Sequence, residues 1–505
     1  MNQEVGQEKS QGPEEVAWRV PGRIEVLGKH TDYAGGSVLV GAVDRAITAR
    51  ARRMSGPPGS LTATTDCGDP VTLRAGVDPG LEPGHWGRYL QTVLDRLTLN
   101  FGAGTAAHLS ISSDLPPASG MSSSSALVCA TALALASLNG WDEDPRWVES
   151  MPDRLSLAGY LAAVEGGRAW RDLPGTSGVG TRGGSEDHTG MLCGAQDRLL
   201  LAGFDPMRIE RTISFPAQWA LVVGVSGVLA HKTGAALEDY NRGPSTVQAV
   251  LGRWNETTGR TDASLAGAVR HLVGEATGEQ AAGDPALKDL LGLCEPGYER
   301  QRIEQFLIES LVLVPEGARL IAAADPGVGE VLERSQELAD RGLCNQVPQT
   351  RLMVSLARQA GAIGASSFGA GWGTNELLSS HSQHGQAQQQ GGGNGQGMPG
   401  GGQGGPGGGG PGGQGGPGGQ MPGGGPGGQG GRGGPGGQNG QNGQRGPGGG
   451  SGGAGRTTPN GDASSGSGSS GDQQSGSGSG DGNQKGGSGS SGVLQQQDAS
   501  PSTQS

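Results

Sequence analysis

The chain opens with alternating apolar and polar positions that predict two strands joined by a turn. Residues 16–28, VAWRVPGRIEVLG, alternate in this way, and residues 37–53, SVLVGAVDRAITARARR, continue as an extended apolar run. Such patterns are typical of strands with a buried face. The segment DYAGG at 32–36 has the composition of a turn. The folded part of the chain is therefore predicted to begin with β-structure.

Helical spacing appears next and leads into a strand, loop and helix. Residues 85–98 place apolar side chains on one helical face: Trp86, Tyr89, Leu90, Val93, Leu94 and Leu97. A strand is predicted at 107–116, and a helix runs from Ser122 to a glycine stop at Gly140. Hydroxyl residues stand at the helix start, where they are expected to act as caps.

The second half of the chain predicts a few strands and then mainly helices. Strands are expected at 198–204 and 218–228, and residues 244–360 are mostly amphipathic helix. The fold class is therefore α+β. The length suits two lobes, predicted at 16–215 and 216–380, because single cores stop growing near about 250 to 300 residues.

The composition changes near residue 381, and the chain beyond is predicted to be a disordered tail, 381–505. The chain has 103 glycines, many of them in this Gly, Gln, Pro and Ser-rich part. Few apolar residues there could offset the roughly 1 to 2 kcal/mol that ordering each residue costs. Glycine does not recur at every third position, which argues against collagen. Residues 1–15 are also predicted to be disordered.

Charge and cysteine usage exclude several classes of protein. The formal net charge of −12 argues against nucleic acid as the main partner. The sequence contains no run of about 18 apolar residues, which a membrane-spanning helix would need. It also has no apolar segment near the N-terminus of the kind found in secretion signals. The five cysteines are scattered without a CxxC pair, which suits reduced thiols: Cys67, Cys129, Cys193, Cys294 and Cys344. A cytoplasmic protein without nucleic-acid or membrane partners is expected.

The loop before the long helix is a candidate phosphate site. Residues 112–127, SSDLPPASGMSSSSAL, place small residues and hydroxyls at a helix N-terminus, where free backbone N–H groups favour an anion. The candidate binding residues are Ser119, Gly120, Ser122, Ser123, Ser124 and Ser125. The loop is neither a Walker A sequence nor a GxGxxG motif. A serine-rich helix cap remains the alternative interpretation.

Two further segments have the character of functional loops. PGRIEVLGKHTDYAGG at 21–36 is dense in polar groups between two strands, and GASSFGAGWG at 364–373 would let the backbone approach a ligand or a strand closely. With the phosphate loop, predicted at 114–126, they resemble the three motifs of the galactokinase-type GHMP sugar kinases. Those motifs are GRxNxIGEHTDYxxG, PxGxGLSSSAA and GAxxxGAGxGG.

Two weaker similarities extend the resemblance over most of 16–373. They are HWGRYLQTVLDRL at 85–97 and VVGVSGVLAHKTGAALEDYNR at 222–242. The resemblance implies a two-lobed GHMP kinase fold. It also implies transfer of the γ-phosphoryl group of ATP, with Mg²⁺, to the C1 hydroxyl of galactose or a related sugar. The oligomeric state is left open.

The resemblance assigns roles to individual residues. GVGTRGGSEDHTG at 178–190 stands where the family has GIMDQF, so Asp187 matches the catalytic aspartate and Arg23 its arginine partner. Ser124 and Glu165 match the Mg²⁺-binding positions. The residues that match sugar contacts are Lys29, His30, Asp32, Gly184 and Tyr240.

The sequence also departs from the family pattern. Lys29 replaces the glutamate of GEHTDY, and an ammonium can only donate hydrogen bonds, so a uronic acid becomes an alternative substrate. Ala118 stands where a glycine is usual. After residue 373 the family continues with a strand and a helix, whereas TNELLSSHSQHGQ leads here into low complexity, so the second lobe is expected to be incomplete.

Two alternatives to an enzyme follow from the same features. A non-catalytic sugar or ATP sensor with the same fold needs neither Arg23 nor Asp187, so their presence favours a kinase. A scaffold function would rest on the composition of the tail alone.

Overall fold

The computed structural model describes residues 13–116, 119–226, 228, 235–369, 371, 374–380 and 495–497. The main sheet runs β11-β1-β2-β5-β3-β4, with β6 also paired to β2 and β7 paired to β6. Its strands are β1 (Glu15–Leu27), β2 (Ser37–Arg53), β3 (Ser60–Thr65), β4 (Gly68–Arg74), β5 (Ala107–Ser113), β6 (Arg198–Phe204), β7 (Met207–Ser214) and β11 (Gln495–Gln497).

The long strand β2 organises this sheet. It pairs antiparallel with β1 along almost its full length. The end of β2, Ile47–Arg53, also pairs with β5, and its beginning, Ser37–Val40, pairs with β6. The predicted strands at the start of the chain, at 107–116 and at 198–204 are thus confirmed. The sequence reading missed β3, β4 and β7.

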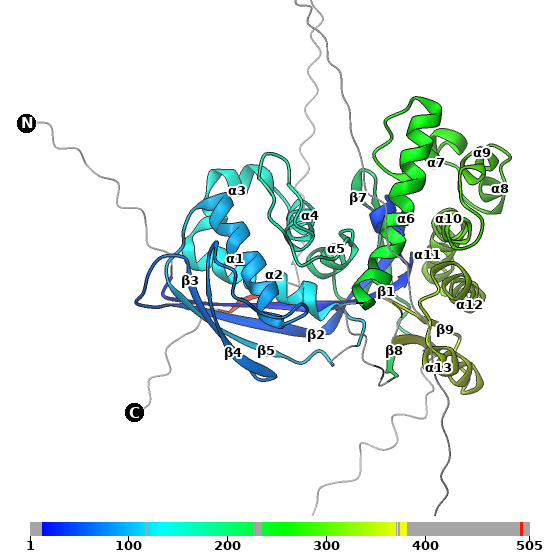
Figure 1. Cartoon of the computed structure of the whole chain (residues 1–505). Coiled ribbons are helices and arrows are strands. Elements are labelled where there is room, and N and C mark those ends of the chain that lie inside the picture. Colours follow the sequence, from blue (N-terminus) through cyan, green and yellow to red (C-terminus); the bar gives the residue numbers. More distant parts are fainter. Residues whose placement is uncertain are drawn as a thin grey trace, which may run out of the picture. The chain divides into compact units, whose positions relative to one another are not determined.

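Helices cover one face of the main sheet (Figure 1). They are α1 (Trp86–Phe101), α2 (Ser123–Asn139), α3 (Pro145–Ser150), α4 (Arg154–Glu165) and α5 (Glu186–Cys193), with a short turn η2 (Trp141–Glu143). Helix α2 packs on β1 and β2 and is flanked by α1 and α4. It is therefore buried along most of its length and is apolar on all sides. This packing fixes the end of α2 that carries the predicted phosphate loop.

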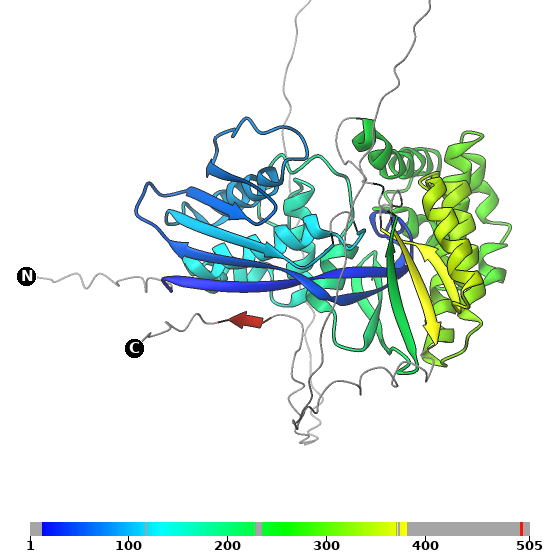
Figure 2. The ribbon, with the colours of Figure 1, turned by 90° about the horizontal axis from the view of Figure 1, so that it is seen from below.

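The rest of the folded chain combines a three-stranded sheet with helices. The sheet runs β8 (Trp219–Val225), β10 (Thr374–Ser380), β9 (Gly364–Ser367), all antiparallel, and Figure 2 shows the green β8 beside the yellow strands. The helices are α6 (Ala235–Thr258), α7 (Leu265–Val273), α8 (Glu279–Ala282), α9 (Leu287–Gly292), α10 (Tyr298–Ile308), α11 (Val314–Ala322), α12 (Val328–Leu338) and α13 (Pro348–Gln359), with the π-turns η3 (Glu309–Leu313) and η4 (Ala339–Leu343).

Strand β10 corrects one expectation. The segment TNELLSS was expected to lack the strand that follows the last motif, yet it forms the central strand of this sheet and pairs with both β8 and β9. Its Leu377 and Leu378 stand within a β-competent run whose partners lie far away in the sequence. The part of the chain where the family pattern has a helix after this strand lies outside the described residues, as does most of the predicted tail. The lobe boundary at 215/216 stays a prediction.

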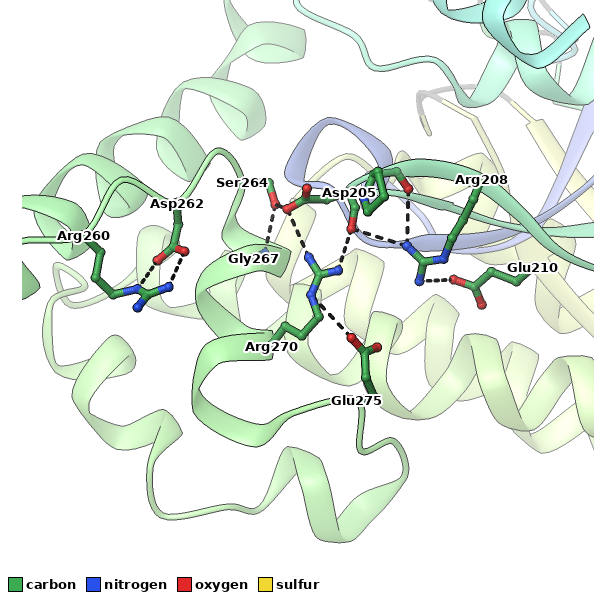
Figure 3. A network of polar contacts seen from close by, with 10 residues as sticks. Asp205, Arg208, Glu210, Arg260, Asp262, Ser264, Gly267, Arg270 and Glu275 are labelled. Carbon is green, nitrogen blue, oxygen red and sulfur yellow. Dashed lines mark hydrogen bonds and ion pairs between the residues drawn. The ribbon is translucent and has the colours of Figure 1, made fainter. Parts of the chain in front are cut away.

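A polar network joins the β6–β7 turn to helix α7 (Figure 3). Arg270 donates to the carbonyl oxygen of Asp205 at 2.5 Å and pairs with its carboxylate at 3.2 Å. Ser264 caps α7 by accepting from Gly267 N at 2.9 Å and donates to Asp205. A Cβ on Gly35 would lie 2.5 Å from the Ser264 hydroxyl. The network thus also supports the turn η1 (Asp32–Ala34), which carries predicted sugar contacts.

Candidate active site

The phosphate loop delivers exposed backbone groups to the start of α2. Gly120 and Ser122 both adopt left-handed backbone angles, with φ of 69° and 53°. Ser122 makes no capping hydrogen bond with its side chain, so the expectation that a hydroxyl caps this helix is wrong. The first-turn N–H groups of α2 are left without that acceptor. An anion at this helix N-terminus would supply it.

Strand β1 lies directly against the phosphate loop and brings Arg23 to it. Arg23 N donates to Met121 O at 3.3 Å, and Arg23 Nη1 donates to Gly120 O at 2.6 Å. A Cβ on Gly22 would lie 2.8 Å from Met121 O, so only glycine permits this approach. Arg23 is 4% exposed. Its guanidinium is therefore held in one orientation beside the loop.

Helix α5 places Asp187 opposite Arg23. Arg23 Nη2 forms an ion pair with Asp187 Oδ1, and the Ser125 hydroxyl donates to Asp187 Oδ2 at 3.3 Å. The Asp187 side chain keeps 27% exposure, so its carboxylate reaches the solvent of the cleft. The predicted catalytic pair is thus brought together with the phosphate loop.

Burial and charge act in opposite directions on these groups. Burial by itself lowers the pKa of Arg23, but the carboxylates of Asp187, Glu186 and Glu25 outweigh it and raise that pKa above its ordinary value. Burial, and then the Asp187 carboxylate, raise the pKa of Asp32. Arg23 therefore stays charged at any pH at which the protein is folded.

Four of the predicted sugar contacts line the same cleft as Asp187: His30, Asp32, Gly184 and Tyr240. The Asp32 carboxylate accepts from Glu186 N at 3.2 Å, and a Cβ on Gly184 would lie 2.2 Å from Asp32 Oδ2. His30 lies with its ring centroid 6.4 Å from that of Tyr240. Burial, and then the carboxylates of Asp187 and Asp32, raise the pKa of Tyr240 well above its usual range. The group offers donors and acceptors suited to hydroxyls.

The glycine-rich segment after β9 approaches the phosphate loop closely. A Cβ on Gly369 would lie 2.9 Å from Gly120 O, and one on Gly371 would lie 2.5 Å from the Asn345 amide. Both glycines have positive φ. The close approach that the sequence predicted for this segment is thus made to the phosphate loop.

Ser124 and Glu165 both line the cleft, and both act on Tyr89. A hydrogen bond joins the Ser124 and Tyr89 side chains, and the Glu165 carboxylate raises the pKa of Tyr89, after burial, to about 12. Glu165 Oε2 also lies 3.2 Å from His188 Nε2. Among the described residues no three His, Cys, Asp or Glu side chains gather into a metal cluster. A hard cation here would take two protein oxygens and phosphate for the rest, which fits Mg²⁺.

These groups line a cleft of about 780 Å³. All of the predicted site residues except Lys29 line it: Arg23, His30, Asp32, Ser119, Gly120, Ser122, Ser123, Ser124, Ser125, Glu165, Gly184, Asp187 and Tyr240. Residues that the sequence reading missed also line it: Glu25, Tyr33, Trp86, Tyr89, Glu186 and His188. Trp86 and Tyr89 were assigned only to a helix face. Glu25 and Tyr33 lay within a motif, and only their neighbours were chosen.

Lys29 points away from the cleft, which corrects the expectation that it meets the substrate. Lys29 is 2% exposed, and its Nζ donates to the Ser335 hydroxyl at 2.7 Å. Ser335 in turn donates to Glu309 at 2.8 Å, and Glu309 accepts from Gly28 N at 3.0 Å. The ammonium is therefore joined through the Ser335 hydroxyl to a buried carboxylate on η3, and Lys29 does not line the cleft. This placement removes the basis for a uronic acid as the substrate.

Replacing Lys29 with Met should therefore destabilise the fold and leave sugar preference unchanged. Removal of the ammonium breaks its hydrogen bond to Ser335 beside the buried Glu309 carboxylate, and we expect a loss of about 1.5 to 3 kcal/mol in the free energy of unfolding. Urea denaturation of the variant and of Lys29→Met/Glu309→Gln, which should recover much of the loss, measures this. A change in the ratio of kcat/KM for galactose and galacturonate in Lys29→Met would contradict the placement.

Sequence comparison identifies the class to which this fold and cleft belong. The chain matches the GHMP kinases N terminal domain over residues 88–167 and the galactokinase galactose-binding signature over residues 7–53. With the phosphate loop at the start of α2, these matches make the chain similar to the GHMP kinases and, within that class, to the galactokinases.

Individual relatives agree with this placement. Galactokinase from Streptomyces coelicolor is 38% identical over 134 residues, which are 25% of this chain and 34% of that protein. Galactokinase from Mycobacterium tuberculosis is 27% identical over 364 residues, which are 71% of this chain and 87% of that protein. The match thus spans about a third of the Streptomyces protein and most of the mycobacterial one.

One solved structure shares the fold. Lactococcus lactis galactokinase complexed with galactose matches with a TM-score of 0.57 and 18% identity, over 73% of this chain and 87% of that chain. This similarity supports the two-lobed α+β architecture. Across the described residues, no helix is both long enough and apolar enough to cross a membrane.

Proposed function

We propose that this protein is an ATP-dependent sugar kinase that transfers the γ-phosphoryl group to the C1 hydroxyl of galactose or a related sugar. The Arg23–Asp187 pair carries this proposal, because it contacts the phosphate loop and lines the same cleft as His30, Asp32 and Tyr240. A phosphate donor and a polyhydroxyl acceptor would meet at this pair. The galactose-binding signature and the galactose complex of the Lactococcus relative support a sugar as acceptor.

Phosphoryl transfer depends mainly on positioning and charge. Asp187 would orient the sugar hydroxyl and accept its proton, and Arg23 would neutralise charge on the transferring group. The sugar oxygen forms its bond to the γ-phosphorus while the bond to the β-phosphate oxygen breaks, and ADP leaves with that electron pair. The ion pair with Arg23 holds the Asp187 carboxylate in position for this role.

Ser124 and Glu165 would hold the Mg²⁺ that accompanies ATP. Such an ion supplies charge neutralisation between phosphate oxygens. Tyr89 neighbours Ser124, and His188 Nε2 lies 3.2 Å from Glu165 Oε2.

An ADP-release assay with the purified full chain tests the proposal. Galactose is expected to give the highest kcat/KM in a panel of aldoses and uronic acids. ATP binding without turnover of any sugar would favour the sensor instead. We also propose a cytoplasmic location, which the free state of all five cysteines supports.

A further inference from the structure

Three buried amide side chains form a line of hydrogen bonds from strand β9 to His30, and the transfer described above uses none of them. Gln336 lies on α12, and Asn345 and Gln346 lie in the segment between η4 and α13. Their exposed fractions are between 3% and 8%. None of these three described residues is among those that line the cleft. A buried amide has to satisfy its donors and acceptors within the protein, so its orientation can be inferred from its partners.

The backbone of β9 fixes the orientation of the first amide. Ser367 N can only donate, and it donates to Gln336 Oε1 at 2.7 Å. The other end of that amide, Gln336 Nε2, therefore donates to Gln346 Oε1 at 3.2 Å. Gln346 Nε2 in turn donates to Asn345 Oδ1 at 2.8 Å. Reversing any one of these amides alone would place two donors or two acceptors face to face.

The line of amides ends on the imidazole of His30. Asn345 Nδ2 lies 3.4 Å from His30 Nε2. Because Asn345 Oδ1 is turned toward Gln346, the group turned toward the ring is the NH₂ donor, and His30 Nε2 has to accept. A neutral imidazole that accepts at Nε2 carries its proton on Nδ1.

The contacts of the other ring nitrogen are compatible with this assignment. Arg302 on α10 is fully buried and donates to Tyr33 Oη at 3.0 Å and to the carbonyl oxygen of His30 at 2.6 Å. Tyr33 Oη lies 3.2 Å from His30 Nδ1. A phenolic oxygen can accept more than one hydrogen bond, so it can receive both the guanidinium and Nδ1–H.

We propose that Gln336, Gln346 and Asn345 form an amide relay that sets the tautomer of His30. The relay holds the ring with its proton on Nδ1 and with Nε2 as an acceptor. His30 lines the cleft, so a sugar hydroxyl that meets Nε2 has to donate to it. The three amides are thus positioning residues that act on the sugar through His30. The tautomer does not depend on the proposed kinase function, whereas its effect on a sugar rests on it.

Nitrogen-15 NMR of the full chain tests the tautomer without reference to activity. Two-bond ¹H–¹⁵N correlations of protein labelled at histidine distinguish Nδ1–H from Nε2–H, and His30→Gln identifies the His30 signals by their loss. The spectra are recorded near about pH 8, where an ordinary imidazole is neutral. We expect the His30 proton on Nδ1. A wild-type His30 with its proton on Nε2 overturns the proposal.

Gln336→Glu tests the relay at the end far from the ring. The carboxylate keeps the acceptor for Ser367 N but loses the donor to Gln346, so Gln346 and Asn345 should reverse and the ring proton should move to Nε2. The matched control is Gln359→Glu at an exposed position of α13, which should keep the wild-type tautomer.

A second variant decides the result if Gln336→Glu does not fold. Asn345→Asp replaces the donor next to the ring with an acceptor, and it should also move the proton to Nε2. An unchanged tautomer in folded Gln336→Glu refutes the relay, and without that variant the same result in Asn345→Asp refutes it.

Calorimetric titration with galactose tests the positioning role. Gln336→Glu should weaken galactose binding about ten-fold, because Nε2–H can no longer accept from a hydroxyl. Its affinity for ATP should stay within about two-fold of wild type, because the relay ends on His30 and not on the phosphate loop. An equal loss of both affinities, or an inverted tautomer with unchanged galactose affinity, refutes the positioning role. A wild-type protein with the Nδ1–H tautomer that binds no sugar contradicts the proposed function and leaves the relay in place.

Discussion

Replacing Asp187 with Asn is expected to lower kcat by about 10²- to 10⁴-fold while nucleotide affinity stays nearly unchanged. The amide cannot accept the proton of a sugar hydroxyl, and it removes the charge that pairs with Arg23. It still accepts from the Ser125 hydroxyl, so the start of α5 should keep its place. Single-turnover phosphoryl transfer and titration with a fluorescent ATP analogue measure the two quantities separately.

A matched control is available on another helix. Asp289 lies in the first turn of α9, as Asp187 lies in the first turn of α5, but it is exposed and far from the cleft lining. Asp289→Asn should leave kcat unchanged. Near-normal turnover in Asp187→Asn would show that this carboxylate is not the catalytic group.

Replacing Arg23 with Lys is expected to lower kcat by about 10³-fold or more. The guanidinium reaches Gly120 O, Asp187 and Glu186 at once, and a single ammonium cannot reproduce that planar set of donors. The charge is retained, so the loss would report geometry rather than net charge. Steady-state kinetics at saturating ATP and sugar give the effect, and circular dichroism establishes that the variant is folded.

Arg19→Lys on the same strand is the control for this substitution. Arg19 is exposed and pairs with Asp114 at 3.4 Å, an interaction worth little at a surface. Its replacement should leave kcat within about two-fold of wild type. Wild-type rates in Arg23→Lys would instead assign Arg23 a purely structural role.

Much of this fold could be predicted from local sequence patterns. The β1–β2 hairpin, the helix α1 and the strand, loop and helix around the phosphate loop depend on periodicity and turn residues within short windows. The motif residues could be chosen for the same reason, since each motif is contiguous. Thirteen of the fourteen chosen residues accordingly line one cleft.

The orientation of the Lys29 side chain could not be predicted from local patterns. It is decided by Ser335, which lies 306 residues from Lys29 in the sequence. It also depends on Glu309, which lies 281 residues from Gly28. A motif states which residue types occur but not which side chain turns toward the ligand.

The sequence by itself determined the β1–β2 hairpin, the helix α1, the strand, loop and helix around the phosphate loop, and the choice of residues that line the cleft, because these depend on near neighbours. Only the tertiary structure decided that Thr374–Ser380 is a central strand, that α5 turns Asp187 toward Arg23, and that Lys29 is buried beside Glu309. Each of these depends on a partner distant in the chain, and the free energy of such contacts arises only when folding brings the partners together.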